Sequence, residues 1–200
     1  MTDPDHSPPR RSSGSAPREA AERVGRIQAL DKPAHRVGKA VRSIIGQGKV
    51  KDALSGRFLG HPLHPLLTDV PIGTWTSASL LDLFGGRDSE VAARRLVATG
   101  LLAALPTIAS GYSDWADAEP ASDEVRRIGI VHAAANATAV TLYAASYAAR
   151  RRGDRGSGAA LALAGASALG VGGHLGGHLA YVNGAGVERS AGGPAGERPA

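Results

Sequence analysis

Histidine is the residue type in this chain best suited to chemistry, and five of its seven copies fall near the ends of predicted helices. They are His61 and His64 in the run HPLHP, His132 in VHAAAN, and His174 and His178 in GGHLGGHLAY. Neutral imidazole is the commonest side-chain ligand of transition metals, and it also binds haem iron. The i, i+4 spacing of the last two places them on one helix face. The pattern indicates a site for haem b or a transition metal.

The two cofactors would use these histidines differently. Axial ligands of one haem lie on opposite faces of the ring, so neighbours on one helix, His174 and His178, cannot both bind the same iron. A bis-His haem would pair one of them with His132, His61 or His64. For a compact ion such as zinc, iron or copper, the candidate ligands are His61, His64, His174, His178 and Asp69.

A structural role is the alternative for the same side chains. A histidine that hydrogen-bonds a backbone carbonyl or Asn136 would hold membrane helices together without a cofactor. Gly172, Gly173, Gly176 and Gly177 interleave the last two histidines, and this spacing permits either close helix approach or entry of a flat ring. In HPLHP the prolines favour an extended segment that points both of its histidines the same way.

Four apolar stretches must position these histidines, at residues 66–84, 96–112, 128–149 and 159–182. At about 1.5 Å of rise per residue, each reaches roughly 26 to 36 Å, enough for a hydrocarbon core of about 30 Å. The last two lack the charged face that a helix of a soluble bundle keeps. We therefore predict an all-α integral membrane four-helix bundle. With antiparallel spans, all five histidines lie in the same half of the membrane.

The remaining segments are assigned by composition. The membrane domain is predicted at 59–187, and the stretch 34–58 is predicted to form an amphipathic juxtamembrane helix that Gly46 and Gly48 end. Residues 1–33 form a basic tail rich in proline, serine and glycine, and together with residues 188–200 they are expected to be disordered.

The charge distribution and the absence of certain motifs limit the range of possible functions. Lys and Arg number 12 up to Arg57, against 6 Asp and Glu, and no pattern of interleaved aromatic residues accompanies them. This charge pattern favours a lipid surface over nucleic acid as the partner of the tail. It also favours a cytoplasmic N-terminus. The chain has no cysteine and no GxSxG, HExxH or GxxxxGK[ST] motif, so we expect an electron-transfer or structural subunit rather than an enzyme. A small transporter using Asp69 and Asp82 is the third alternative.

Several of these runs together resemble a known family. LGHPLHPLLTDVPIGTWTSASLLDLFGG, ASGYSDWAD, RRIGIVHAAAN and LGGHLAYVNGAGV are similar to the bacterial membrane family called domain of unknown function 2231 (DUF2231), over about residues 55–187. The resemblance implies a four-span protein of the bacterial cell membrane without an established activity. In some similar proteins a Rieske iron–sulfur domain follows the fourth span. Without cysteine this chain cannot build one, so a Rieske-type or other redox partner would be a separate chain.

Overall fold

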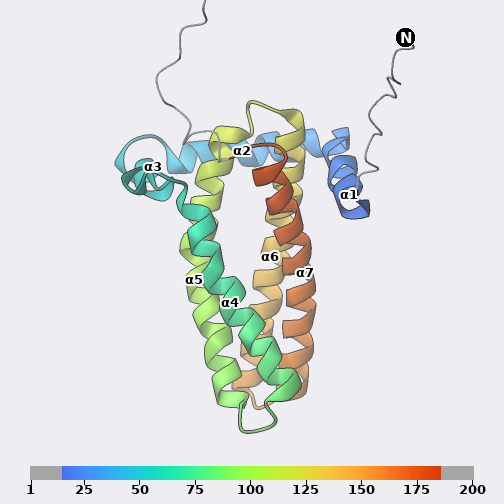
Figure 1. Ribbon diagram of the computed structural model, residues 1–200. Helices are drawn as coiled ribbons and strands as arrows, with labels where there is room; N and C mark the ends of the chain where they lie inside the picture. Colours follow the sequence, from blue (N-terminus) through green and yellow to red (C-terminus); the bar gives the residue numbers. More distant parts are fainter. Residues whose placement is uncertain (1–14, 186–200) are drawn as a thin grey trace, which may run out of the picture.

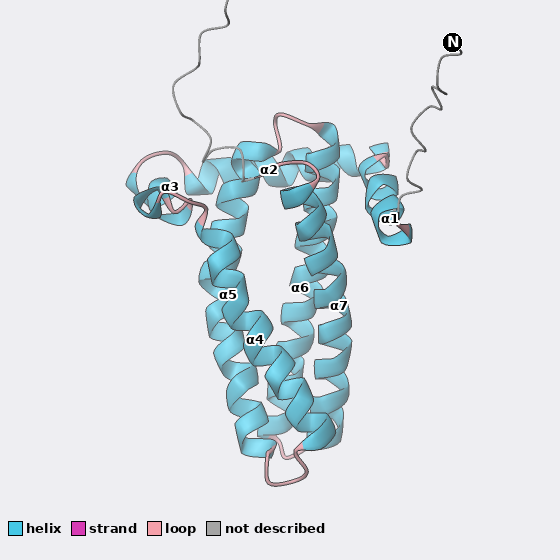
Figure 2. Cartoon of the chain, viewed as in Figure 1, coloured by secondary structure: helices cyan, strands magenta, loops and turns pink. Residues whose placement is uncertain are grey.

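The computed structural model describes residues 15–185, and the regular secondary structure of this part of the chain is all helical, with no strand (Figures 1 and 2). The all-α prediction is confirmed. The elements, in chain order, are α1 (Ala16–Gly25), η1 (Gln28–Leu30), α2 (Asp31–Ile45), α3 (Lys49–Leu54), η2 (Arg57–Leu59), α4 (Leu63–Phe84), α5 (Glu90–Ala118), α6 (Asp123–Arg151) and α7 (Arg155–Tyr181).

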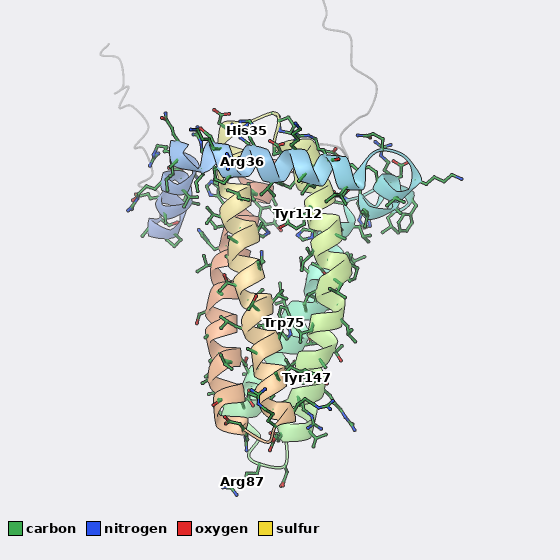
Figure 3. All side chains as sticks on the ribbon, turned by 180° about the vertical axis from the view of Figure 1, so that it is seen from behind. His35, Arg36, Trp75, Arg87, Tyr112 and Tyr147 are labelled. Carbon is green, nitrogen blue, oxygen red and sulfur yellow. The ribbon has the colours of Figure 1, made fainter. Side chains whose placement is uncertain are left out.

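The four long helices form an antiparallel bundle made of two pairs, α4 with α5 and α6 with α7 (Figure 1). The turns 85–89 and 152–154 lie at one end, and the turn 119–122 lies at the other end beside α2. Trp75 on α4 and Tyr143 on α6 stack with ring centroids 4.1 Å apart and planes 9° apart. The Trp75 Nε1–H also donates to the carbonyl of Val97 on α5, 3.2 Å away. This aromatic contact joins the two pairs in the half of the bundle away from α2 (Figure 3).

Two prolines lie inside the long helices, Pro71 in α4 and Pro106 in α5. A proline has no N–H, so Pro71 leaves the carbonyl of Leu67 without its usual helical donor. The hydroxyl of Thr107 on α5 lies 3.1 Å from this carbonyl and 2.8 Å from the carbonyl of Ala103 in its own helix, so the two acceptors share its single hydrogen. A neighbouring helix thus offers a donor to the freed group.

Three of the four bundle helices, α5, α6 and α7, are long and apolar enough to cross a membrane by length and composition. Less than a third of each apolar stretch is buried within the chain, which leaves the rest for lipid. Helix α4 is not among them, since Asp69, Asp82 and several hydroxyl residues lower its hydropathy. The helices also run past the predicted stretches, because hydropathy marks only the part at hydrocarbon depth and polar residues continue the same backbone.

The segment before the bundle differs from its prediction. Helix α2 lies across the end of the bundle, and the predicted helix at 34–58 is divided into α2 and α3 (Figures 1 and 3). The division falls where Gly46 and Gly48 adopt φ angles of +63° and +100°, which side chains with a Cβ rarely adopt. The glycines therefore end α2 as expected, but a second short helix follows them.

The expectation of disorder for residues 1–33 is wrong for its later part. Residues 16–25 form α1, which packs against α6 and α7 through the fully buried Ala21. Its neighbours there include Val125, Ile128 and Leu175. Small apolar side chains within a polar composition give too weak a signal to stand out in the sequence. The parts of the predicted tails at 1–14 and 186–200 lie outside the described residues.

Candidate functional site

His64 on α4 and His132 on α6 face the inside of the bundle from different helix pairs, and they are close enough to interact electrostatically. We call them the histidine pair. The Nδ1–H of His64 donates to the carbonyl of Thr107 on α5 at 2.9 Å. The Nδ1–H of His132 donates to the carbonyl of Gly172 on α7 at 2.8 Å. Each imidazole is thus fixed by the backbone of the other helix in its own pair, and its tautomer follows from the carbonyl acceptor.

Glycines make room for both rings. A Cβ on Gly111 of α5 would come within 2.7 Å of His64 Cε1, and one on Gly176 of α7 within 2.9 Å of His132 Cε1. Real Cβ atoms do not approach heavy atoms that closely, so both positions require glycine while the rings stay in place. The adjacent Gly173 and Gly177 have no neighbour within 4 Å. The glycine run therefore has a packed side toward α6 and an open side.

The second ring nitrogens differ between the two histidines. His64 Nε2 has no hydrogen-bond partner among residues 15–185, whereas the amide of Asn136 donates to His132 Nε2 at 3.1 Å. Asn136 lies one turn after His132 and also donates to its backbone carbonyl. A neutral imidazole whose Nδ1–H is held by a carbonyl presents its Nε2 lone pair, which is how a metal-binding histidine is oriented.

His174 and His178 do not join the histidine pair. Residues two apart on an α-helix point about 200° away from each other, and His132 contacts α7 at Gly172 and Gly176. His174 and His178 therefore point away from the side of α7 that His132 contacts. His174 Nε2 bonds the carbonyl of Pro17 on α1 at 2.9 Å, and the buried His178 Nε2 lies 3.9 Å from Glu124 Oε1.

The other candidate ligands are also dispersed. His61 is exposed and its Nδ1–H donates to the carbonyl of Pro62 at 3.2 Å, and Asp69 is exposed on α4. The extended HPLHP segment is not observed, because α4 begins at Leu63 and His64 is already helical. Within residues 15–185 no three His, Asp or Glu side chains are grouped so that they could hold a metal ion. The proposed set of His61, His64, His174, His178 and Asp69 is not brought together.

Two further charged residues are buried for structural reasons that the sequence did not reveal. Arg150 on α6 forms a two-pronged ion pair with Asp82 on α4, with Nη1 and Oδ1 2.9 Å apart. Lys51 on α3 bonds the hydroxyl of Ser113 at 3.0 Å and the carboxylate of Asp117 at 2.9 Å. Asp82 is therefore neutralised within the bundle, which removes it from the free intramembrane charges a transporter would use.

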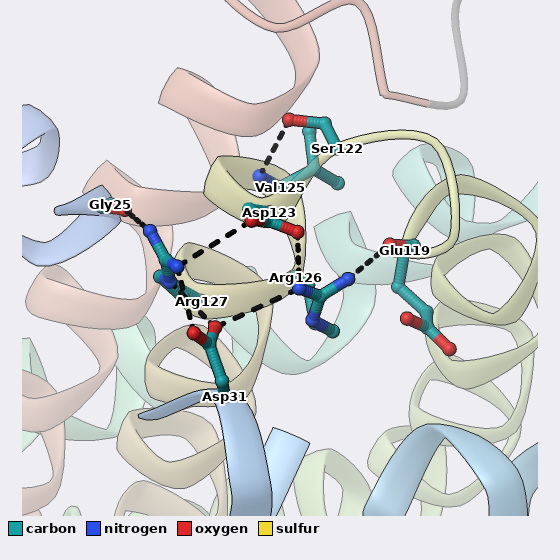
Figure 4. A network of polar contacts seen from close by, with 8 residues as sticks. All are labelled: Gly25, Asp31, Glu119, Ser122, Asp123, Val125, Arg126 and Arg127. Atoms are coloured by element: carbon teal, nitrogen blue, oxygen red, sulfur yellow. Dashed lines mark hydrogen bonds and ion pairs between the residues drawn. The ribbon is translucent and has the colours of Figure 1, made fainter. Parts of the chain in front are cut away.

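A polar network at the α2 end attaches the N-terminal helices to the bundle (Figure 4). Arg127 on α6 donates hydrogen bonds to both carboxylate oxygens of Asp31, at 2.7 and 2.8 Å, and to the carbonyl of Gly25 at 3.0 Å. Hydrogen bonding to Arg127 holds the pKa of Asp31 below its usual value, against desolvation, which acts to raise it; the charges of Arg127, Arg126 and His35 lower it further.

A helical bundle with three long apolar helices and a polar site between its helix pairs defines a helical membrane protein. The chain belongs to the family described as predicted membrane protein (DUF2231), whose family model matches residues 60–189. This confirms the family resemblance drawn from the HPLHP, VHAAAN and GGHLAY runs. Neither a search of curated proteins nor a search of solved structures found a match to this chain.

Proposed function

We propose that this protein is a small membrane subunit for electron transfer that binds one haem b between His64 and His132. The observation that carries the proposal is the geometry of the histidine pair: two imidazoles on different helix pairs, each with Nδ1–H fixed by a backbone carbonyl. His64 and His132, held on different helix pairs, would be the two residues that bind the iron. The open Nε2 of His64 is ready to bind, and rotation of the Asn136 amide would release that of His132.

Two features of the bundle support a cofactor at the histidine pair. Gly111 and Gly176 let the rings lie close to the helix axes, and the helix pairs are joined at Trp75 and Tyr143 in the other half of the bundle. When bound, a haem with two imidazole ligands supplies one-electron transfer. The protein's part is to hold the rings, fix their tautomers and exclude water. An electron partner, Rieske-type or other, would be a separate chain.

We also propose how the bundle crosses the membrane. Helix α4 would act as the fourth span, because it pairs with α5 along the bundle and its Asp82 is neutralised by Arg150. The end of the bundle beside α2 would face the cytoplasm of a bacterial cell. Helices α1 to α3 lie against this end, so their Lys and Arg residues are close enough to the spans to count in the positive-inside rule.

A structural role is the second candidate, and one observation favours it. The hydrogen bonds from His64 to Thr107 and from His132 to Gly172 join α4 to α5 and α6 to α7 without any cofactor. Such bonds stabilise membrane helix pairs by roughly 0.6 to 2 kcal/mol each.

An absorption spectrum separates the two candidates. Protein expressed with ample haem and purified in detergent should show a Soret band that shifts on reduction. His64→Ala and His132→Ala should each abolish or strongly weaken the band, whereas His61→Ala and His174→Ala should retain it. Wild-type protein that stays colourless after haem reconstitution would refute haem binding. In that case both interior variants should lower only the thermal stability.

A further inference from the structure

A basic pocket lies between α5 and α6 at the end of the bundle opposite α2. It has a volume of about 210 Å³ and is lined by Arg94, Arg95, Ala98, Tyr147 and Arg151. We call it the arginine pocket. Figure 3 shows Tyr147 where α5 and α6 run side by side near this end. Three of the five lining side chains carry a positive charge, and none carries a negative one.

Arg94 is half-buried and Arg95 and Arg151 are exposed, and all three lack the partners that Arg150 and Arg127 have. Arg150, next to Arg151, is paired with Asp82, and Arg127 at the other end is paired with Asp31. Within residues 15–185, Arg94, Arg95 and Arg151 make no ion pair or side-chain hydrogen bond. Three unpaired guanidinium groups around one hollow favour an anion, and their planar forks match the oxygens of a phosphate.

The surface next to the pocket indicates what carries the phosphate. From Ala98, the positions one and two turns further along α5 are Leu102 and Leu105, which are 71% and 64% exposed. Residues at i, i+4 and i+7 share one helix face, so this apolar stripe runs from the pocket along the membrane-crossing part of α5. A free phosphate would use only the arginines. A phospholipid would use both, with its headgroup in the pocket and an acyl chain along the stripe.

Tyr147 fits the same position. Tyrosine is enriched at the level of lipid headgroups, where its ring is apolar and its hydroxyl meets water. Basic pockets between membrane helices are a known form of headgroup site. From the charge, the hollow and the stripe we infer that the arginine pocket binds the phosphate of an anionic phospholipid.

The test is a lipid titration of the full chain in a neutral detergent, read out as the thermal unfolding temperature. Phosphatidylglycerol should raise this temperature in a saturable way, and phosphatidylcholine should raise it much less. Arg94→Gln, Arg95→Gln and Arg151→Gln should each raise the lipid concentration at half-saturation about fivefold, since one basic residue near an anionic surface contributes about that factor to the affinity. The matched controls Arg87→Gln and Arg155→Gln, at the same end but outside the pocket, should behave as wild type.

A second variant guards against effects of charge on folding. Ala98→Phe would fill the pocket while all three arginines remain, and it should abolish the phosphatidylglycerol effect. An unchanged response in the triple Arg→Gln variant or in Ala98→Phe would overturn the assignment. An equal response to phosphatidylcholine would overturn the preference for an anionic lipid. An equal response to inorganic phosphate would replace the lipid by a soluble anion.

Discussion

Arg150 and Asp82 form a two-pronged ion pair whose side chains are 0% and 2% exposed, at the end of the bundle opposite α2. It connects α6 to α4, which belong to different helix pairs. The Nε–H of Arg150 also lies 3.2 Å from the hydroxyl of Ser146, whose own hydrogen bond reaches the carbonyl of Gly158 on α7. One arginine thus links three helices, and this explains how the acidic side chain of Asp82 can be buried in the bundle.

Breaking this pair should strongly destabilise the bundle. Asp82→Asn leaves a buried guanidinium without a counter-charge, and loss of one partner of a buried pair costs about 3 to 5 kcal/mol. Thermal unfolding in detergent measures the effect. The control Asp88→Asn changes an exposed residue in the adjoining turn and should have no effect. The double variant Asp82→Leu with Arg150→Met should recover most of the loss, and a double variant as unstable as the single one would contradict the pairing.

Two adjacent glycines of α7 should respond differently to the same substitution. Gly176→Val places methyl groups against the His132 ring, and such overpacking costs roughly 1 to 3 kcal/mol. Gly177→Val meets open space and should leave stability nearly unchanged. Both variants change helix propensity equally, so the difference in unfolding temperature reports the packing alone. Equal losses would show that α7 does not present Gly176 to α6.

Docking of α1 should depend on Ala21 and not on its neighbour. Ala21→Gln puts a polar chain where the alanine is fully buried against α6 and α7, so α1 should detach. Trypsin should then cut after Arg23 and Arg26 faster than in wild type. Ala20→Gln changes an exposed position of the same helix and should leave the cutting rate as it is. Fast cutting of the wild-type protein would contradict the docked helix.

Attachment of α2 should weaken in acid. Hydrogen bonding to Arg127 lowers the pKa of Asp31 in the docked state, so its contribution is present above the usual carboxyl pKa of 3.8. It is lost as the pH falls from 3.8 through the lowered value, where the carboxylate becomes protonated. Spin labels on single cysteines at positions 36 and 153 should then show a broader distance distribution as the pH falls through the lowered pKa of Asp31. The Asp31→Asn variant should already give a broad distribution at neutral pH. A narrow, unchanged distribution in this variant would argue against attachment of α2 through Asp31 and Arg127.

The fourth span can be tested by labelling from one side. The chain has no cysteine, so single cysteines at positions 61, 87 and 153 give clean signals with an impermeant reagent. If α4 crosses the membrane, position 61 should react from one side, and positions 87 and 153 from the other. Reaction of 61 and 87 from the same side would show that α4 does not cross.

The sequence by itself determined the class of protein. Apolar stretches almost free of charge and short polar connectors predict an all-α membrane bundle, because the hydropathy and length of a segment are local properties. The turn glycines at 46 and 48 and the family runs around HPLHP, VHAAAN and GGHLAY are local signals of the same kind. Residues 16–25 were missed since their burial depends on a contact with α6 and α7, not on their own composition.

Only the tertiary structure decided which histidines meet. The antiparallel order of the spans places five of them in one half of the membrane. This order determines the depth of each histidine but not the rotation of its helix about the helix axis. That rotation is set by packing: Gly172 and Gly176 against α6 turn His174 and His178 away from His132. The pairing of Asp82 with Arg150 is likewise a contact between residues 68 positions apart. Such contacts depend on how the faces of several helices pack at once, and one sequence carries no direct record of that.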